Sequence, residues 1–320
     1  MKKFIAVLLI VTTLLSLCFV PAYAEKSVKP SIDHNLIREA FNEEIQKTIQ
    51  SGKAKGAVAT LVVEGKELLK TGYGYAVEDL GIESDPDLTG FRIGSISKTF
   101  VAVAALMAAE DGLLDFHTDI SEYLGVDFPK LRYPVTMHHL LTHTGGFEEI
   151  ITGMAVKNIS DTDPLSITVR KYIPEQIFKP GKVASYSNYG TALAAYVVEC
   201  ATGIDFADYS IDRIFKPLGM DHTTFAHTHD KVYVSHAYLP NGKETLEPYM
   251  NLYPEGSAVS TAHDMGTYIR WLMSDDANIL SLNGKEQLLS RQFSSSDELS
   301  GIGYIWNIKT RNEYTYFDKK

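Results

Sequence analysis

A serine and a lysine three residues apart provide the first candidate chemistry in this sequence. Ser95 and Lys98 directly precede an apolar stretch that runs from Val101 to Ala109, and such a stretch predicts a helix that is buried on all sides. Three positions along a helix is one turn, so the lysine would lie within reach of the serine hydroxyl. A serine becomes a nucleophile when an adjacent base takes its proton, and a lysine on a buried helix face can be that base when desolvation leaves it neutral. The pattern also recurs by chance, and a surface serine and lysine in an ordinary first helical turn would look the same.

A second polar group follows at Tyr186-Ser-Asn188, at the start of another expected helix. Alternate residues of an extended turn project the same way, so we expect the Tyr186 phenol and the Asn188 amide to face one site. A phenol beside a lysine ammonium can give or take a proton, and an asparagine amide can orient a substrate carbonyl. The alternative is a polar helix cap, which is less attractive because this group occurs together with the Ser95 segment.

Hydrophobic periodicity predicts the elements that position these residues. Helical spacing covers residues 33–50, an extended hairpin is expected over 56–63 and 67–75, and the buried helix is expected over 99–111. Further helices are expected at 136–142, 189–202, 205–215, 262–273 and near 285–291, and extended runs at 301–309 and 313–317.

This order of elements predicts an α/β (α+β) fold, in which helices flank an antiparallel sheet and a helical lobe is inserted. The α/β lobe would consist of residues 25–114 and of an incomplete second part, residues 255–320, on either side of a helical lobe at 115–254. The sequence contains no internal repeat and no low-complexity linker.

Residues 1–24 have the pattern of a secretory signal peptide. Two lysines follow Met1, an apolar stretch runs to Val20, and Ala22-Tyr-Ala24 provides a small-x-small cleavage site. A retained membrane anchor is the alternative, but the apolar stretch is short and is interrupted by threonine and serine. We therefore expect a secreted, extracytoplasmic protein of the cell envelope, with no membrane span in its mature form. Its one remaining cysteine, Cys200, leaves no intramolecular disulfide.

The charge and hydropathy of the chain restrict its partners. The 320 residues include 30 basic and 40 acidic side chains, for a net charge of −10. No run of like charge exceeds a few residues, whereas nucleic-acid binding needs clustered cations. The mean hydropathy of −0.08 argues against a polytopic membrane protein. The expected partner is a small-molecule or peptide substrate, and not a nucleic acid.

The sequence resembles the serine β-lactamase and penicillin-binding protein superfamily, and within it the class C β-lactamase-like branch with D-alanyl-D-alanine carboxypeptidases and related esterases. The resemblance runs from about residue 36 to 310, and its segments follow the family's order. The segments are Phe91-Arg-Ile-Gly-Ser-Ile-Ser-Lys-Thr-Phe100, Leu140-Leu-Thr-His-Thr-Gly-Gly146, Tyr186-Ser-Asn-Tyr-Gly190, Ile214-Phe-Lys-Pro-Leu-Gly-Met220 and Gly256-Ser-Ala-Val-Ser-Thr-Ala-His-Asp-Met265. Tyr-Ser-Asn stands where class A enzymes have Ser-Asp-Asn.

The resemblance implies a β-lactamase/transpeptidase-like fold and a serine hydrolase that forms an acyl-serine intermediate, without metal or cofactor. It implies that Ser95 is the acylated nucleophile, Lys98 its proton partner and Tyr186 a general base and acid, while Asn188 contacts the substrate. The substrate would be a β-lactam, an ester or a D-Ala-D-Ala-type peptide such as a peptidoglycan stem peptide. The alternative is a catalytically weak or inactive penicillin-binding-like homologue that binds cell-wall peptide without efficient turnover.

One motif of the resembled family is missing. Its third motif, Lys-Thr-Gly or His-x-Gly, lies late in the chain on a strand beside the nucleophile, where it supplies an oxyanion N–H and a cation or polar group for the substrate carboxylate. No such motif follows Asn188, so we expect the sequence to stop short of that strand. A literal Lys70-Thr-Gly72 precedes the nucleophile, and we interpret it as a coincidence.

Two other kinds of site have weaker support. Asp221-His222 and His227-Thr-His229-Asp230 contain metal-ligand residue types, but they lack the further Asp-His pair of hydrolytic zinc patterns and fall in a polar loop. No metal site is therefore expected. No serine has the Gly-x-Ser-x-Gly surroundings of an α/β-hydrolase.

The assignment of the nucleophile leads to a first prediction. A fluorescent penicillin or a fluorophosphonate should add its mass to Ser95 and to no other residue, because an adjacent lysine on a buried helix activates only this serine. Intact-mass analysis of the parent protein and of the Ser95→Ala variant measures this directly. Equal labelling of the two proteins would rule out Ser95 as the nucleophile.

Overall fold

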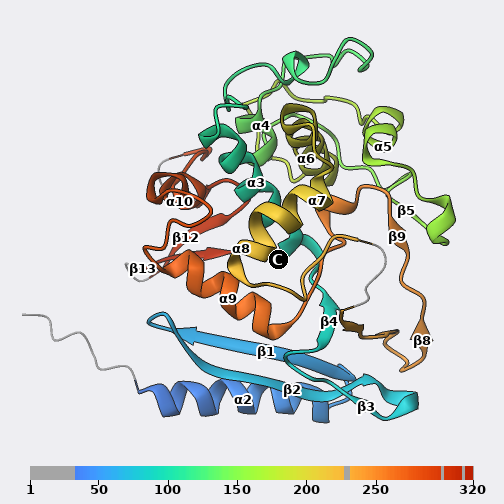
Figure 1. The fold of residues 1–320 in the computed structure, drawn as a ribbon, viewed down its shortest axis with the longest axis vertical. Coiled ribbons are helices and arrows are strands. Elements are labelled where there is room, and N and C mark those ends of the chain that lie inside the picture. The colour runs from blue at the N-terminus through green and yellow to red at the C-terminus, as the bar shows by residue number, and fades with distance from the viewer. Residues whose placement is uncertain (1–32, 227–230, 297–298, 312–313, 320) are drawn as a thin grey trace, which may run out of the picture. The chain divides into compact units, whose positions relative to one another are not determined.

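The computed structural model of the chain describes residues 33–226, 231–296, 299–311 and 314–319 (Figure 1). The leader predicted at residues 1–24 lies outside the described residues. Arg38–Lys320 is one compact unit, and residues before Arg38 are divided from it. Apart from the first residues of α2, the elements below belong to this compact unit.

Helices occur along the whole length of the described residues. They are α2 (His34–Gln50), α3 (Lys98–Glu110), α4 (Met137–Leu141), α5 (Leu165–Lys171), α6 (Asn188–Thr202), α7 (Phe206–Ser210), α8 (Lys216–Leu218), α9 (Ala262–Met273) and α10 (Leu282–Leu289). None of these helices combines the length and apolar character needed to cross a membrane.

The strands are mostly short. They are β1 (Gly56–Val63), β2 (Lys66–Val77), β3 (Ile82–Glu83), β4 (Thr89–Arg92), β5 (Ala155–Val156), β6 (Tyr233–Val234), β7 (Ala237–Tyr238), β8 (Glu244–Thr245), β9 (Tyr249–Met250), β10 (Val259–Ser260), β11 (Gly301–Ile302), β12 (Asn307–Arg311) and β13 (Tyr314–Asp318). They form three-stranded sheets in the orders β1-β2-β3, β10-β4-β6 and β11-β12-β13, and the two pairs β5-β9 and β7-β8. The pairs are antiparallel except β4–β6, which is parallel. The prediction of a mixed α/β fold is confirmed.

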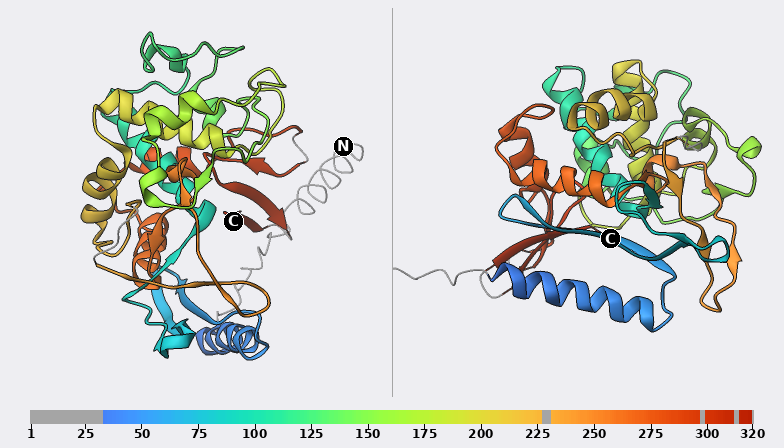
Figure 2. Two further views of the ribbon diagram at one scale, coloured as in Figure 1. Left: turned by 90° about the vertical axis from the view of Figure 1, so that its right-hand side faces the viewer. Right: turned by 60° about the horizontal axis from the view of Figure 1, so that its bottom comes forward.

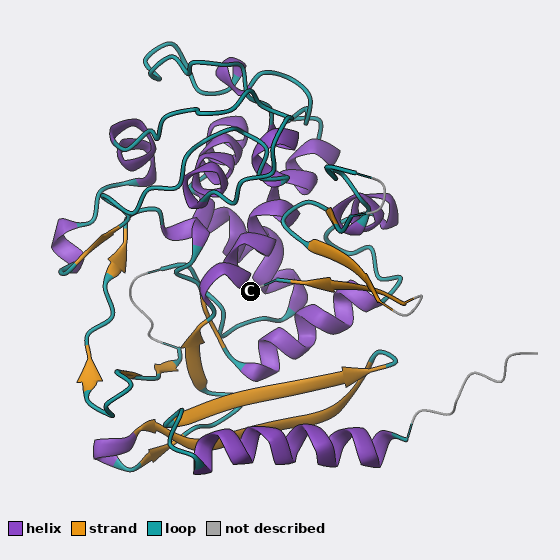
Figure 3. Ribbon diagram, turned by 180° about the vertical axis from the view of Figure 1, so that it is seen from behind, coloured by secondary structure: helices purple, strands orange, loops and turns teal. Residues whose placement is uncertain are grey.

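The predicted hairpin is the longest sheet element. β1 and β2 pair from Gly56 opposite Gly74 to Val63 opposite Lys66, around a turn in which Glu64 and Gly65 have positive φ. Helix α9 packs on one face of the hairpin, and residues 38–50 of α2 lie along the other (Figures 1 and 3). The nearly continuous apolar run of β1 suits this position, because both of its faces then have a helix to pack against.

Helix α3 is the centre of the core. Each residue from Lys98 to Ala108 is buried, as the apolar stretch from Val101 predicts for most of the helix. Phe100 has no exposed surface and packs against the rings of Phe215, Phe225 and Tyr268, at centroid distances of 4.8–6.2 Å. This packing fixes α3 and therefore the residue at its first position, Lys98.

The C-terminal elements differ in detail from the prediction. The helix expected near 285–291 is α10, which begins earlier because Ser281 caps it by accepting a hydrogen bond from the Gly284 N–H. The run expected at 301–309 is divided into β11 and β12. Between them Ile305 takes a φ of 73°, and its N–H donates to the Leu141 carbonyl. β12 and β13 then pair side by side (Figure 2).

Candidate active site

Ser95 lies in a tight 3₁₀ turn, η2 (Gly94–Ser97), between β4 and α3. Gly94 begins the turn with a φ of 51°, a conformation that glycine adopts at little cost. The Ile93 N–H donates to the Ala258 carbonyl, and the Ala258 N–H donates to Ser97 Oγ. The segment after η6 (Tyr253–Glu255) therefore holds the turn in place, and Ser95 is left half-buried at its surface.

Lys98 is the first residue of α3, one 3₁₀ turn after the serine. Its side chain is fully buried, and Nζ donates to Ser95 Oγ at 2.9 Å. The expected spacing of one helical turn therefore brings the two groups together. The helix begins at Lys98 rather than beside Ser95, because η2 comes before it.

Tyr186 reaches the same serine from a distant loop. Its Oη lies 2.6 Å from Ser95 Oγ, and Lys98 Nζ lies 5.1 Å from the centroid of its ring. The phenol is 42% exposed, so the site is open to solvent on this side. The structure thus brings Ser95, Lys98 and Tyr186 into one hydrogen-bonded group.

A turn around His143 positions Tyr186. The Ser185 N–H donates to the His143 carbonyl, and the Ser187 N–H donates to Nδ1 of the same histidine. The imidazole packs on the Tyr186 ring at a centroid distance of 4.7 Å. Because Nδ1 accepts a hydrogen bond, the proton of the neutral ring is on Nε2.

His143 is itself held in an unusual state. Its φ is 56°, which is uncommon outside glycine and is concentrated at functional sites. Burial, followed by the charges of Lys319 and Lys98, lowers the pKa of His143 to about 3. The imidazole is therefore neutral near pH 7, and its part in the site is to support Tyr186.

Asn188 does not join the serine group. Its Nδ2 donates to Glu149 Oε1 at 2.7 Å, and its backbone N–H donates to Glu149 Oε2 at 3.0 Å. Asn188 is the first residue of α6, so the Glu149 carboxylate lies at the positive end of that helix, where an anion is favourable. Asn188 Oδ1 is buried and has no hydrogen-bond partner among the described residues. Tyr186 and Asn188 thus contact different groups.

Lys319 is a site residue that the sequence analysis missed. It follows β13, and its Nζ lies 4.8 Å from the centroid of the Tyr186 ring. Burial and the nearby Lys98 charge lower the pKa of Lys319 to about 8. Lys319 is not part of a Lys-Thr-Gly or His-x-Gly tripeptide, which is the motif expected after Asn188. The sequence signal that could have indicated it is a lysine shortly after the last predicted extended run.

Glu255 is the second residue that was missed. Its carboxylate accepts a hydrogen bond from Lys98 Nζ at 2.9 Å, and both side chains are buried. Nothing in the spacing Pro254-Glu-Gly256 marks this glutamate as part of a site, because its partner is 157 residues away in the sequence.

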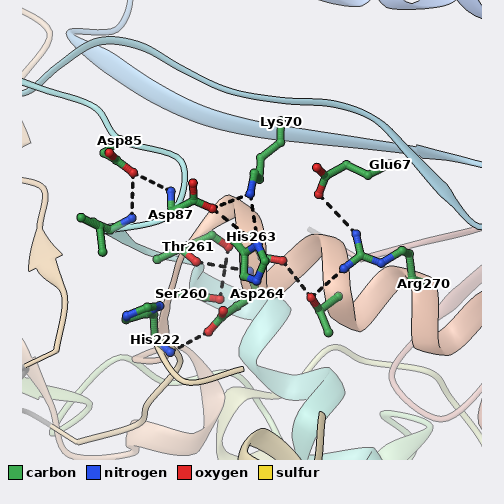
Figure 4. Close-up of polar contacts among 12 residues, drawn as sticks. Glu67, Lys70, Asp85, Asp87, His222, Ser260, Thr261, His263, Asp264 and Arg270 are labelled. Carbon is green, nitrogen blue, oxygen red and sulfur yellow. Dashed lines mark hydrogen bonds and ion pairs between the residues drawn. The ribbon is translucent and has the colours of Figure 1, made fainter. Parts of the chain in front are cut away.

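The literal Lys70-Thr-Gly72 contacts other groups. Lys70 Nζ lies 2.5 Å from Asp87 Oδ1 and 3.1 Å from Nδ1 of His263, at the start of α9 (Figure 4). Gly72 is needed for packing, since a Cβ there would lie 1.7 Å from the Ser84 carbonyl oxygen. These contacts give the tripeptide a structural role in the hairpin.

The polar loop that was considered for metal binding is only partly described. His227, His229 and Asp230 lie outside the described residues. The His222 N–H donates to Asp264 Oδ2, so this segment is tied to the start of α9 (Figure 4). Within the described ranges, no group of three or more His, Cys, Asp or Glu side chains has a metal-binding arrangement.

Comparison with known proteins identifies the family. Residues 41–317 match the family model described as Beta-lactamase. The chain belongs to the beta-lactamase family. This beta-lactamase family member is 31% identical over 251 residues to "Putative penicillin-binding protein PbpX" of Bacillus subtilis (strain 168). The match covers 77% of the chain and 61% of that protein's length.

Solved structures of similar fold include the octameric penicillin-binding protein homologue from Pyrococcus abyssi, with a TM-score of 0.74 and 25% identity. That match covers 87% of this chain and 66% of the other. A beta-lactamase/D-alanine carboxypeptidase from Pseudomonas syringae has a TM-score of 0.72 at 20% identity, over 88% and 82% of the two chains. At this identity the likeness concerns the fold. The predicted β-lactamase/transpeptidase-like fold is confirmed.

The state of His143 predicts how stability depends on pH. A histidine whose folded pKa lies below its unfolded value contributes stability above pH 6.5, and this contribution is lost as the pH falls toward 3. Replacement by asparagine, which tolerates positive φ, should reduce the loss of unfolding free energy between pH 7 and pH 4 by on the order of 3 kcal/mol. Urea unfolding at both pH values measures this, with the more exposed His236→Asn as control. Equal losses in His143→Asn and the parent would contradict it.

Proposed function

We propose that this protein is a serine hydrolase that attacks an amide or ester carbonyl and passes through an acyl-Ser95 intermediate. The observation that carries the proposal is the position of Ser95 Oγ between Lys98 Nζ, at 2.9 Å, and Tyr186 Oη, at 2.6 Å. A serine hydroxyl within hydrogen-bond distance of groups that can take its proton meets the geometric requirement for nucleophilic catalysis. Family membership supports the same chemistry.

The reaction would proceed through two tetrahedral intermediates. Ser95 Oγ forms a bond to the carbonyl carbon as its proton leaves for the adjacent base, and the carbonyl π electrons move to the oxygen. The leaving amine or alkoxide then takes a proton as its bond to carbon breaks. Water repeats these steps on the acyl-serine and releases the acid and free Ser95.

The charges of the site favour a substrate with a carboxylate near the scissile bond. Lys319 brings an ammonium group beside the Tyr186 ring, and an anionic group of a substrate bound there would gain a charge-assisted hydrogen bond. β-Lactams and D-Ala-D-Ala-type peptides carry such a carboxylate, whereas simple esters do not. A solved structure of the same fold is described as a beta-lactamase/D-alanine carboxypeptidase, which agrees with both of these substrate classes.

A location outside the cytoplasm belongs to the same proposal. The lysine start, apolar middle and Ala22-Tyr-Ala24 site of residues 1–24 support export. Cell-wall stem peptides would then be accessible to the site.

Replacement of Tyr186 by phenylalanine tests the proposal. Tyr186→Phe keeps the ring on His143 but removes the phenolic proton acceptor, so acylation by a fluorescent penicillin should slow by about 10²–10⁴-fold. Stopped-flow fluorescence measures the rate, and Tyr314→Phe, at a 74% exposed tyrosine, is the matched control. An unchanged rate in Tyr186→Phe would contradict the proposed role.

A second candidate function is binding of cell-wall peptide without efficient turnover. It is favoured by one observation: the Asn188 amide, which would orient a substrate carbonyl, donates instead to the Glu149 carboxylate. The two functions differ after acylation. A single burst of product with negligible steady-state hydrolysis would support the binding function, and continued turnover would support the hydrolase.

The pKa of Lys319 predicts a pH-dependent preference. The fraction of charged Lys319 falls roughly tenfold between pH 7 and pH 9 if it titrates near 8. The ratio of kcat/KM for a carboxylate-bearing ester to that for its neutral amide analogue should fall by a similar factor. Lys319→Met should give a low ratio at both pH values, and Lys243→Met, at an exposed lysine after β7, should behave as the parent. A pH-independent ratio in the parent would contradict a role for Lys319 in carboxylate binding.

A further inference from the structure

Lys98 and Glu255 form an ion pair that is closed off from solvent. Nζ lies 2.9 Å from Glu255 Oε2, and the two side chains are 0% and 5% exposed. The carboxylate comes from η6, which contacts the η2 turn that carries Ser95. Removing two charges from water is costly unless they pair with each other. Each of these ions therefore depends on the other.

Three hydrogen-bond acceptors surround the Lys98 amine, one for each N–H of an ammonium group. A lysine ammonium has three N–H groups, and the acceptors around Nζ are Ser95 Oγ, Glu255 Oε2 and the Glu255 backbone carbonyl. If the amine gave up a proton, the buried Glu255 carboxylate would lose its counter-ion. That cost opposes the neutral form of Lys98.

We propose that Glu255 is a positioning residue that keeps Lys98 as an ammonium, so that Tyr186 and not Lys98 takes the proton of Ser95. The inference rests on the proposed acyl-serine function and refines it. It differs from the expectation that desolvation makes Lys98 a neutral base, because the desolvated lysine has a buried counter-ion.

In this reaction Tyr186 carries the proton from Ser95 to the leaving group. Ser95 Oγ bonds to the carbonyl carbon as its proton passes to Tyr186 Oη, 2.6 Å away, and the phenolic proton of Tyr186 passes to the leaving-group atom. The tetrahedral oxyanion then collapses, the bond to the protonated leaving group breaks, and Tyr186 is again a neutral phenol. Lys98 donates to Oγ and keeps its three protons, and the charge of Glu255 does not change.

Other ionisable groups face this pair. The Tyr186 ring and Lys319 lie on one side. Burial and the Lys98 charge lower the pKa of Lys319 to about 8, and the charges of Asp318 and Glu255 oppose this shift. The Lys98 charge contributes to the lowered pKa of His143, which is neutral near pH 7. A pH experiment on Lys98 must therefore remove the titration of Lys319 first.

The first experiment compares Glu255→Gln with its parent in a Lys319→Met background. The probe is an uncharged fluorophosphonate, so no carboxylate contact is needed, and the acylation rate is measured from pH 5.5 to 9.5. Gln keeps the hydrogen-bond acceptor but removes the counter-ion, so Lys98 should lose its proton within this range. The ratio of the Gln variant's rate to the parent's should fall at least tenfold as the pH rises. A ratio that rises with pH, or stays constant, would overturn the proposal.

The second measurement uses the unsubstituted protein and does not depend on folding of the Gln variant. Lysine labelled with ¹⁵N at Nζ gives an ammonium NMR signal for a charged, hydrogen-bonded side chain, and loss of one signal in Lys98→Arg identifies Lys98. We expect the ammonium signal to persist from pH 6 to pH 9. A neutral amine at Lys98 at pH 7 would overturn the proposal.

The two experiments separate this inference from the proposed function. If the fluorophosphonate does not label Ser95 in the unsubstituted protein, the acyl-serine function fails, whereas the NMR signal still reports the charge of Lys98. If labelling occurs but the rate ratio does not change with pH, the function stands and the role of Glu255 fails.

Thermal melting gives an independent readout: Glu255→Gln should melt about 10 °C lower, and its melting temperature should rise with pH as Lys98 loses its proton.

Discussion

An ammonium group enclosed at the start of a fully buried helix is the constraint on which the site depends. Lys98 is the first residue of α3, and the positive end of a helix dipole is an unfavourable place for a cation. Its burial among apolar side chains adds a desolvation cost. The Glu255 carboxylate offsets both, so any arrangement that keeps Lys98 beside Ser95 must also bring η6 to α3. The pairing of β4 with β10 meets this requirement.

Hydrogen bonds between two loops, rather than an ion pair, hold Tyr186 in position. The backbone of His143 and Thr144 accepts from Ser185 and Gly181, and the His143 ring accepts from Ser187. His143 has a positive φ, and its ring packs on the Tyr186 ring. The nucleophile is thus fixed by core packing and the phenol by backbone hydrogen bonds, so the two halves of the site respond to different kinds of change.

Features that depend on local sequence patterns could be predicted from the sequence. Periodicity located α2, the β1–β2 hairpin, α3 and α9 within a few residues, and helical spacing predicted the approach of Lys98 to Ser95. The contact between Tyr186 and Ser95 joins residues 91 apart, and it followed from the family resemblance rather than from spacing. Glu149, Glu255 and Lys319 were not found, because each acts through a contact that no local pattern specifies. The division of the run at 301–309 was also missed, since it depends on a long-range hydrogen bond from Ile305.

Gly90, a glycine of β4 outside the site, influences the position of Glu255 relative to Lys98. At Gly90 of β4, a Cβ would lie 2.5 Å from Val259 Cγ1 of β10, so a side chain there would push the two strands apart. β10 follows η6 within four residues, and β4 leads into η2. Separating the strands would therefore move Glu255 relative to Lys98, and the pair loses Coulomb energy as its distance grows. The absence of a side chain at Gly90 thus contributes to the charge state of a lysine that it does not contact.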